Sequence, residues 1–148
     1  MRIALDTTFL AYAEGVDDPA RRQTARTIVE RLIDQDVVLP TQTIGELYNV
    51  LTRKAGINPG DANRRIATWL DGYSTILATE RTFRTALELA CAHRLQFWDA
   101  LILVTASEAG CALLLSEDMQ DGFVWRGLTV VNPFAEKRHP LLASLTGE

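Results

Sequence analysis

Residues that build disulfide frameworks and zinc sites are scarce in this sequence. Its 148 residues include two cysteines and two histidines. Cys91 and Cys111 lie in apolar surroundings, so we expect both to be reduced core residues rather than disulfide partners. His93 and His139 have no nucleophile motif nearby, which argues against serine or cysteine catalysis. The four residues also give no support for a zinc site.

Long hydrophobic runs are also missing. A membrane-spanning helix needs roughly 18 consecutive apolar residues. The longest candidate, residues 100–115, is broken by Ser107, Glu108 and Gly110. An acid at position 6 comes too early for a secretory signal. We therefore expect a cytoplasmic protein that does not enter a membrane.

Positive charge is in short supply. The 15 lysines and arginines are outnumbered by 19 aspartates and glutamates, which gives a net charge of −4. This argues against a protein that coats nucleic acid through a large basic surface. It does not exclude a nuclease, because an acidic metal site itself contributes several negative charges. Arginines that could grip phosphate groups occur locally, the candidates being Arg21, Arg22, Arg53 and Arg84.

Short apolar segments alternate with helical patterns along the chain, and 47% of the residues are hydrophobic, enough for a sizeable core. Strands are predicted at residues 2–5, 37–39, 74–79, 112–115 and 128–131, and helices at 19–32, 41–54, 62–70, 82–93 and 98–109. This alternation is typical of the α/β class, with a central parallel sheet of about five strands flanked by helices. We expect one domain over residues 1–134, followed by a C-terminal tail, residues 135–148.

Four acids stand where apolar segments end: Asp6, Glu46, Asp99 and Asp118. A buried carboxylate costs stability unless it is paired or coordinated, so acids in such places need an explanation. Asp6 and Asp118 follow predicted strands, at the edge where parallel sheets bind ligands. Convergent carboxylate oxygens are the ligands that Mg²⁺ and Mn²⁺ prefer.

Three of these acids have a structural interpretation as well. Asp6 could cap the helical turn that follows it. Thr43 and Glu46 have the spacing of a capping box, in which the glutamate bonds back to the start of its helix, and the sequence does not decide between this role and a functional one. Asp118 lies in a polar segment, residues 116–122, that could be no more than a turn.

Asp99 is the acid for which a functional role is favoured. It lies in the first turn of a predicted helix, where the helix dipole favours negative charge. At helical spacing it shares a face with Leu103 and Ala106, and Phe97 and Trp98 would keep that corner dry. An unpaired acid in such a place is hard to justify on structural grounds alone.

Together these residues resemble the PIN-domain nucleases, and most closely the VapC-like toxins of bacterial toxin–antitoxin pairs. The matching segments, in the expected order, are residues 3–7, 40–47, 97–102 and 115–120. The resemblance spans residues 1–134, and the segments around Asp99 and Asp118 are its more specific parts. It implies a PIN-like domain that cleaves RNA as a metal-dependent endoribonuclease.

The resemblance also implies roles for individual acids. Asp6 and Asp99 would be the principal ligands of Mg²⁺, for which Mn²⁺ could substitute. Asp118 would complete the metal site directly or through water. Glu46 would hold a metal-bound water.

Neighbouring residues add to the implied site. Thr7 and Ser116 match the small hydroxyl residues that the family places beside the first and last acids. Thr8 stands where many relatives have asparagine, which could change the local hydrogen bonding. Asp121 is an additional candidate acid. The implied partners are an RNA substrate, a cognate antitoxin protein and a second copy of the chain in a homodimer.

Two other functions remain as alternatives. A haloacid-dehalogenase-like phosphatase is suggested by Asp6 and Thr8 after the first strand, but that chemistry needs a lysine in the site. Neither Lys54 nor Lys137 follows a predicted strand. The other alternative is a non-catalytic PIN-like module that binds RNA or a protein. The presence of all four acids argues against such a degenerate site.

Overall fold

A six-stranded sheet forms the centre of the computed structural model, which describes all 148 residues. Its strands are β1 (Arg2–Leu5), β2 (Asp36–Pro40), β3 (Ser74–Ile76), β4 (Leu113–Leu115), β5 (Val124–Trp125) and β6 (Leu128–Val131). The strand order is β3-β2-β1-β4-β6-β5, and every neighbouring pair is parallel except β5 with β6. The predicted α/β class with a mainly parallel sheet is confirmed.

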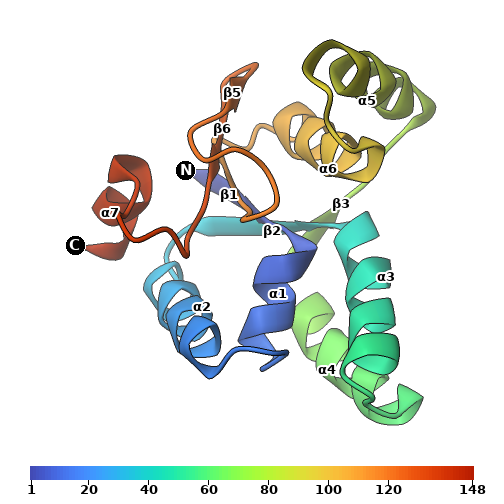
Figure 1. The fold of residues 1–148 in the computed structure, drawn as a ribbon, viewed down its shortest axis with the longest axis vertical. Helices are drawn as coiled ribbons and strands as arrows, with labels where there is room; N and C mark the ends of the chain where they lie inside the picture. The colour runs from blue at the N-terminus through green and yellow to red at the C-terminus, as the bar shows by residue number, and fades with distance from the viewer.

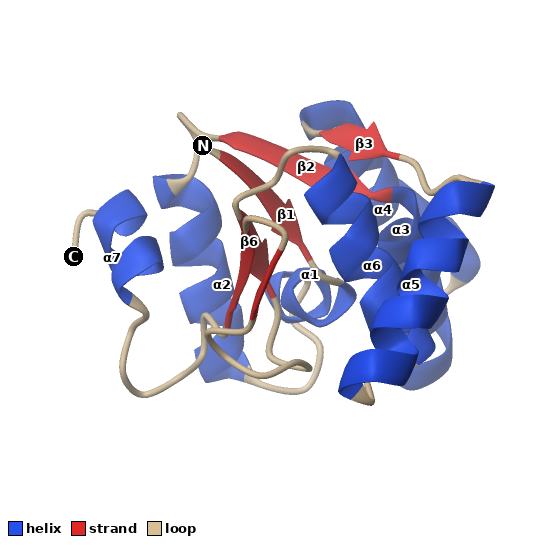
Figure 2. Cartoon of the chain, turned by 90° about the horizontal axis from the view of Figure 1, so that it is seen from above, coloured by secondary structure: helices blue, strands red, loops and turns tan.

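Helices cover both faces of this sheet. Their bounds are α1 (Thr7–Ala13), α2 (Pro19–Arg31), α3 (Thr41–Asn49), α4 (Pro59–Gly72), α5 (Glu80–His93), α6 (Phe97–Glu108) and α7 (Pro140–Thr146), with a π-helical turn, η1 (Val50–Lys54), after α3. Helices α1 to α4 lie on one face and α5 and α6 on the other (Figure 1). Figure 2 shows the central strands between α2 on one side and α5 and α6 on the other. None of the helices is both long and apolar enough to cross a membrane.

The strands form because their side chains fill two separate cores. Successive residues of a strand point to opposite faces of the sheet. Ile3 and Leu5 of β1 join the core beneath α1 to α4, whereas Ala4 joins the core beneath α5 and α6. In β4, Leu114 faces α5 and α6 while its two neighbours face the other core. Burial on both faces explains why these strands are continuous apolar runs in the sequence.

The chain reverses its direction across the sheet between β3 and β4. It forms β1, β2 and β3 in one direction and then returns to place β4 on the other side of β1. Ligands of parallel sheets bind at such a reversal, beyond the carboxyl ends of the two strands. Leu5 pairs with Leu115 in the register of β1 and β4, so Asp6 and Ser116 leave the sheet at the same level.

Several elements differ from the sequence prediction. The third strand ends at Ile76 rather than Thr79, because Thr79 already caps α5 through a capping box. The helix predicted over residues 41–54 is divided into α3 and the π-helical turn η1. The antiparallel strand β5 has no counterpart in the prediction, since its two residues are too few to form a pattern.

Residues 135–148, expected as a tail, carry the helix α7. His139 caps this helix, because its Nδ1 accepts a hydrogen bond from the Leu141 N–H at 3.2 Å. Leu142 is fully buried in the core beneath α1 to α4. The end of the chain is therefore packed against the domain through α7.

The two cysteines differ in their surroundings. Cys111 is buried in the core beneath α5 and α6, as expected. Cys91 is exposed, because α5 turns Ala86 and Leu89 toward the core and leaves position 91 outside. The prediction of a core position is therefore wrong for Cys91. Both cysteines are free, in agreement with the expected absence of a disulfide.

We expect Leu114→Ala to lower the free energy of unfolding by about 2–5 kcal/mol, because it removes fully buried methyl groups and leaves a cavity. Leu77→Ala is the matched control: this side chain is 74% exposed, so its loss should change the stability by no more than about 0.5 kcal/mol. Urea denaturation followed by circular dichroism measures both variants. Equal losses would contradict the assignment of Leu114 to the core.

Candidate metal centre

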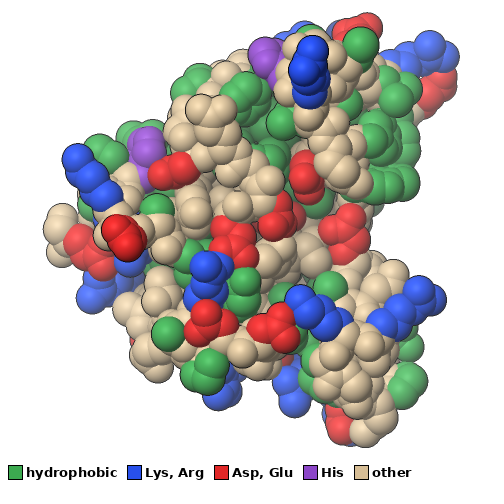
Figure 3. Space-filling model, in the orientation of Figure 1, with side chains coloured by type: hydrophobic (Ala, Val, Ile, Leu, Met, Phe, Trp, Pro, Cys, Tyr) green, Lys and Arg blue, Asp and Glu red, His purple; other side chains and the backbone are tan.

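Three carboxylates from distant parts of the chain meet beyond the carboxyl ends of β1 and β4. Asp6 follows β1, Asp118 follows β4, and Asp99 lies in the first turn of α6. One carboxylate oxygen from each lies within 4.8 Å of the other two. Figure 3 shows acidic side chains gathered along a hollow between the side of α6 and the side of α3. These acids, identified separately in the sequence, lie together in the structure.

Asp6 is the most deeply buried of the three, with 1% of its surface exposed. Its Oδ1 accepts a hydrogen bond from the Thr7 N–H at 2.7 Å, which caps α1. Its Oδ2 accepts a hydrogen bond from the Ser116 hydroxyl at 2.6 Å. Asp6 therefore caps a helix and also faces the other acids, so its two interpretations do not exclude each other.

Glu46 lies beside these acids but is not one of the three whose oxygens converge. Its Oε2 accepts a hydrogen bond from the Thr7 hydroxyl at 2.6 Å, and its Oε1 accepts one from the Gln42 amide at 2.7 Å. The capping-box alternative is wrong. No side chain caps α3, and the Thr43 hydroxyl donates instead to the Pro40 carbonyl at 2.7 Å.

The backbone around Asp99 is held from two sides. The Asp99 N–H donates to Gln96 Oε1 at 3.0 Å, which caps α6. The Gln42 amide, already bonded to Glu46, also reaches the Trp98 carbonyl oxygen at 3.4 Å. Gln42 thereby links α3 to the start of α6. Trp98 is 49% exposed, so the corner is more open to water than the sequence suggested.

Asp118 lies at the open rim of the site and is exposed. The Thr8 hydroxyl donates to its Oδ2 at 2.5 Å, and the Asp118 N–H donates to Ser116 Oγ at 3.2 Å. Asp121 is not among the converging acids. Its Oδ1 accepts a hydrogen bond from the Asn132 N–H at 2.8 Å, so it ties its turn to the end of β6.

Burial and mutual repulsion favour the protonated forms of two of these acids. Burial is the main cause that raises the pKa of Asp6 to about 7, with smaller contributions from the charges of Asp118 and Asp99. Burial, followed by the charges of Asp118 and Glu46, raises the pKa of Asp99 to about 6. A cation would offset both effects. Because carboxylates are hard oxygen ligands, this donor set fits Mg²⁺ or Mn²⁺.

Three residues around the site are not among the predicted site residues: Gln42, Tyr12 and Glu117. The Tyr12 hydroxyl donates to Oε1 of Glu117 at 2.6 Å, and Glu117 directly precedes Asp118 in the chain. For Glu117 the clue in the sequence is its place in the matching segment of residues 115–120, and for Gln42 and Tyr12 the clue is spacing. Gln42 precedes Glu46 by one helical turn, as Thr8 precedes Tyr12, and residues four apart share a helix face.

Neither lysine takes part in the site. Lys54, at the end of η1, is exposed and pairs with Asp17 at 2.7 Å. Lys137 is exposed in the segment before α7. The phosphatase alternative therefore lacks the lysine that its chemistry needs.

The fold and the site together define a class, that of parallel α/β proteins with converging carboxylates where the strand order reverses. A family model described as PIN domain matches residues 3–120. Because this match covers most of the chain, the chain belongs to the PIN domain family, as its resemblance predicted. The haloacid-dehalogenase alternative is thereby rejected. Among curated proteins, no sequence matches the chain significantly.

Solved structures of bacterial toxins share this fold. VapC20 of Mycobacterium tuberculosis, described as a Sarcin-Ricin loop cleaving toxin, is 24% identical, with a TM-score of 0.61 over 76% of this chain and 86% of that one. A toxin–antitoxin complex from Klebsiella pneumoniae is 21% identical, with a TM-score of 0.64 over 89% of this chain and 98% of that one. VapBC2 from Rickettsia felis, bound to a promoter DNA fragment, is 14% identical, with a TM-score of 0.66 over 88% of this chain and 97% of that one. At these identities the likeness shows the fold alone.

We expect the protein in EDTA to lose stability as the pH rises from about 4 to about 7. The pKa of Asp6 is about 7 in the fold against an ordinary value of 3.8, so the folded protein keeps a proton that the unfolded chain releases. Raising the pH through this window therefore favours unfolding. Since one pKa unit corresponds to about 1.4 kcal/mol, the loss should amount to a few kcal/mol.

Urea denaturation of the wild type, Asp6→Asn and Asp34→Asn across this pH range measures the effect. Asp6→Asn should flatten the pH dependence, whereas Asp34→Asn, which changes an exposed aspartate, should follow the wild type. Identical pH profiles for Asp6→Asn and the wild type would refute the burial cost assigned to Asp6.

Proposed function

We propose that this chain is a metal-dependent endoribonuclease that acts as the toxin of a toxin–antitoxin pair. The observation that carries the proposal is the convergence of Asp6, Asp99 and Asp118 where the strand order reverses. A divalent cation bound there would neutralise charge on a phosphodiester and activate water for its hydrolysis. Membership of the PIN domain family supports a nuclease, and the toxin structures with this fold support the toxin role.

The three aspartates would hold Mg²⁺ or Mn²⁺ in this proposal, Asp6 and Asp99 as principal ligands and Asp118 directly or through water. Ser116 and the Thr7 N–H bond one oxygen each of the Asp6 carboxylate, so this carboxylate cannot rotate. Its remaining lone pairs stay available to a ligand. Such neighbouring hydrogen bonds orient metal ligands and tune their affinity.

Glu46 is assigned to hold and orient the attacking water. Hydrogen bonds from Thr7 and Gln42 engage one lone pair on each of its oxygens and fix the plane of the carboxylate. The other lone pairs can accept a proton from water. Because Gln42 also bonds to the backbone at Trp98, Glu46 is tied to the helix that carries Asp99.

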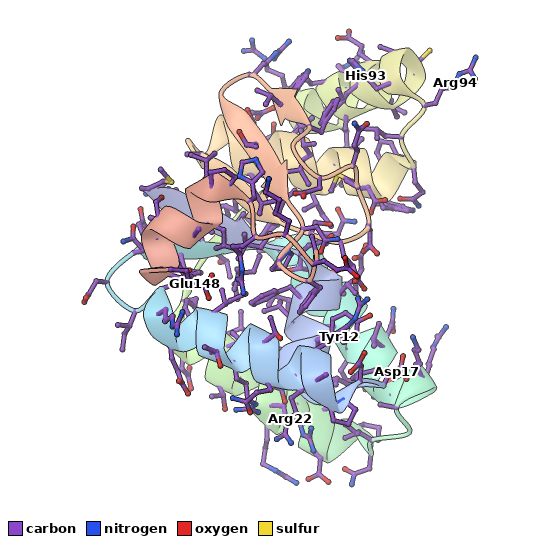
Figure 4. All side chains as sticks on the ribbon, turned by 60° about the vertical axis from the view of Figure 1, so that its left-hand side comes forward. Tyr12, Asp17, Arg22, His93, Arg94 and Glu148 are labelled. Carbon is purple, nitrogen blue, oxygen red and sulfur yellow. The ribbon has the colours of Figure 1, made fainter.

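Ion pairs narrow the choice of arginines that would contact RNA phosphates. Arg21 and Arg84 each pair with a glutamate, so their charges are already compensated. Arg22 and Arg53 are exposed and form no ion pair. These two are therefore the remaining candidates for phosphate contacts. Figure 4 shows Arg22 on α2, at the outside of the molecule.

The proposed partners are a cognate antitoxin and a second copy of this chain. The structures from Klebsiella pneumoniae and Rickettsia felis that share this fold include toxin–antitoxin assemblies, which supports an antitoxin here. Apolar side chains left outside on α5 and α6 support a homodimer, since exposed apolar patches mark interaction sites. Phe83, Leu87 and Trp98 are 39%, 58% and 49% exposed, and Phe97 joins the rings of Phe83 and Trp98.

A non-catalytic module that binds RNA or protein is the second candidate function. The charge of Asp6 argues against it, because a protein that only binds would gain stability by replacing this buried acid. Asp6 lies together with Asp99 and Asp118, the other members of a complete donor set. A cation site explains this costly arrangement, whereas a passive surface does not.

We expect Mn²⁺ to bind the wild type and to lose most of its affinity for Asp6→Asn and Asp99→Asn, because each variant lacks one charged ligand. Isothermal titration calorimetry with Mn²⁺ alone measures this without knowledge of the substrate. Asp34→Asn, an exposed change, should bind as the wild type does. The site assignment fails if folded wild type binds no Mn²⁺ both alone and with a non-cleavable RNA.

Asp99→Asn should reduce RNA cleavage by about 100-fold or more, because it removes a proposed metal ligand. It should leave the fold intact, because asparagine has nearly the same size and the helix keeps its cap at Gln96. Total bacterial RNA incubated with Mg²⁺ and each protein, followed by mapping of the new ends, measures cleavage, and circular dichroism checks the fold. Asp34→Asn is again the control. Undiminished cleavage by Asp99→Asn would remove Asp99 from the site, and intact RNA after incubation with wild type would count against a nuclease.

A further inference from the structure

The loop that carries Asp118 is fastened to α1 and α2 by side chains that have no part in the chemistry proposed above. We propose that Tyr12 is a positioning residue, which sets the affinity of the site for its divalent cation by holding Asp118 in place through Glu117. This inference rests on the proposed function, because it concerns the same site. It adds a residue of α1 that contacts none of the four candidate acids.

Both oxygens of Glu117 are engaged. Its Oε1 accepts a hydrogen bond from the Tyr12 hydroxyl at 2.6 Å, and its Oε2 pairs with the Arg21 guanidinium. Arg21 also donates to the Tyr12 hydroxyl oxygen at 3.3 Å, so the three side chains close a ring of contacts. The Glu117 side chain is only 16% exposed. Charge-assisted hydrogen bonds to both oxygens hold a carboxylate in one orientation.

The Tyr12 ring is fixed as well. The ring of Phe134 packs edge-on against it, with the centroids 5.0 Å apart. The Arg21 guanidinium lies 5.2 Å from the centroid of Tyr12 and 5.3 Å from that of Phe134, within the range of cation–π attraction. In Figure 4, Tyr12 lies at α1, inside the outer layer that α2 forms. The hydroxyl that holds Glu117 therefore comes from a rigid side chain.

The contact between Tyr12 and Glu117 lies one residue before Asp118, a proposed metal ligand that is not buried in the core. Asp6 is fully buried, whereas Asp118 is exposed at the rim, so its place depends on the loop. Thr8 and Tyr12 are one turn apart on α1 and present two hydroxyls to the consecutive acids Asp118 and Glu117. One helix face thus sets the position of the loop relative to Asp6, which starts the same helix.

The ion pair with Arg21 also explains how a fifth acid can stand beside the converging carboxylates. An unpaired Glu117 would add a negative charge next to Asp118 and increase the repulsion among the carboxylates of the site. Arg21 supplies the compensating charge, and it makes a longer contact of 3.5 Å with Asp18 as well. The contacts of Glu117 with Tyr12 and Arg21 therefore position the loop without increasing the repulsion among the carboxylates of the site.

Tyr12→Phe tests the proposal, since it removes the hydroxyl and keeps the ring against Phe134 and Arg21. The Kd for Mn²⁺, measured by calorimetry with the metal alone, should rise about 3- to 10-fold, because groups that orient a metal ligand tune its affinity. The melting temperature in EDTA reports a merely structural role. Tyr73→Phe is the matched control, since the Tyr73 ring stacks on Trp69 far from the acids and should leave the Kd unchanged.

The route through Glu117 is tested by combining variants. Glu117→Ala should weaken Mn²⁺ binding, and adding Tyr12→Phe to it should have no further effect. Glu117→Gln, which keeps an acceptor for the Tyr12 hydroxyl, should be weakened less than Glu117→Ala. Glu117→Leu, which lacks an acceptor for the Tyr12 hydroxyl, replaces the alanine variant in the cycle should that one not fold.

The outcomes separate this inference from the proposed function. If the folded wild type binds no Mn²⁺ either alone or with a non-cleavable RNA, the metal site of the proposed function and the role of Tyr12 are both wrong. If it binds Mn²⁺ only with that RNA, the Kd values of all variants are compared with the RNA present. If the wild type binds Mn²⁺ and Tyr12→Phe binds it equally well, only the role of Tyr12 is overturned, whether or not the melting temperature falls. Full additivity of the Tyr12 and Glu117 changes also overturns it, because the two residues would then act independently.

Discussion

The parallel pairing of β1 with β4 is the constraint on which the rest of this structure depends. It places Leu5 opposite Leu115 at the centre of the sheet, with a buried core on each face. The segments that follow the two strands then leave the sheet side by side, which brings Asp6 next to Ser116. A change of one residue in this register would turn the strand side chains to the wrong faces. The apolar cores therefore hold the polar site in register.

Stability and the proposed function oppose each other at Asp6. Burial of this carboxylate raises its pKa to about 7, so its ionised form is held in the fold at a cost. Hydrogen bonds from Thr7 and Ser116 lower that cost without removing it. The other two acids of the site are less buried than Asp6: Asp99 is half-buried, and Asp118 is exposed at the rim. The gradient from a buried acid to an exposed one leaves the site open on the side of Asp118 while anchoring it in the core.

Most of the fold can be predicted from the sequence, because local patterns of apolar and polar residues indicate the strands and helices. Runs such as residues 112–115 predict buried strands, and the helix predicted over residues 19–32 is present as α2, which begins at Pro19. The segments that the sequence does not resolve are those whose partners are distant. Helix α7 is stabilised by packing of Leu142 into a core built by other elements, and β5 exists only through its pairing with β6.

The sequence by itself determined the α/β class, the main elements and the four acids that stand at their ends, because periodicity and residue type are local properties. Only the tertiary structure decided which groups each acid contacts. Glu46 has the spacing of a capping box, yet a hydroxyl from Thr7, 39 positions away, bonds its carboxylate instead. Glu117 looks like part of a polar turn until Tyr12 and Arg21 converge on it. Such contacts depend on which strands are neighbours in the sheet, and that order is set by the global packing of the chain rather than by any local pattern.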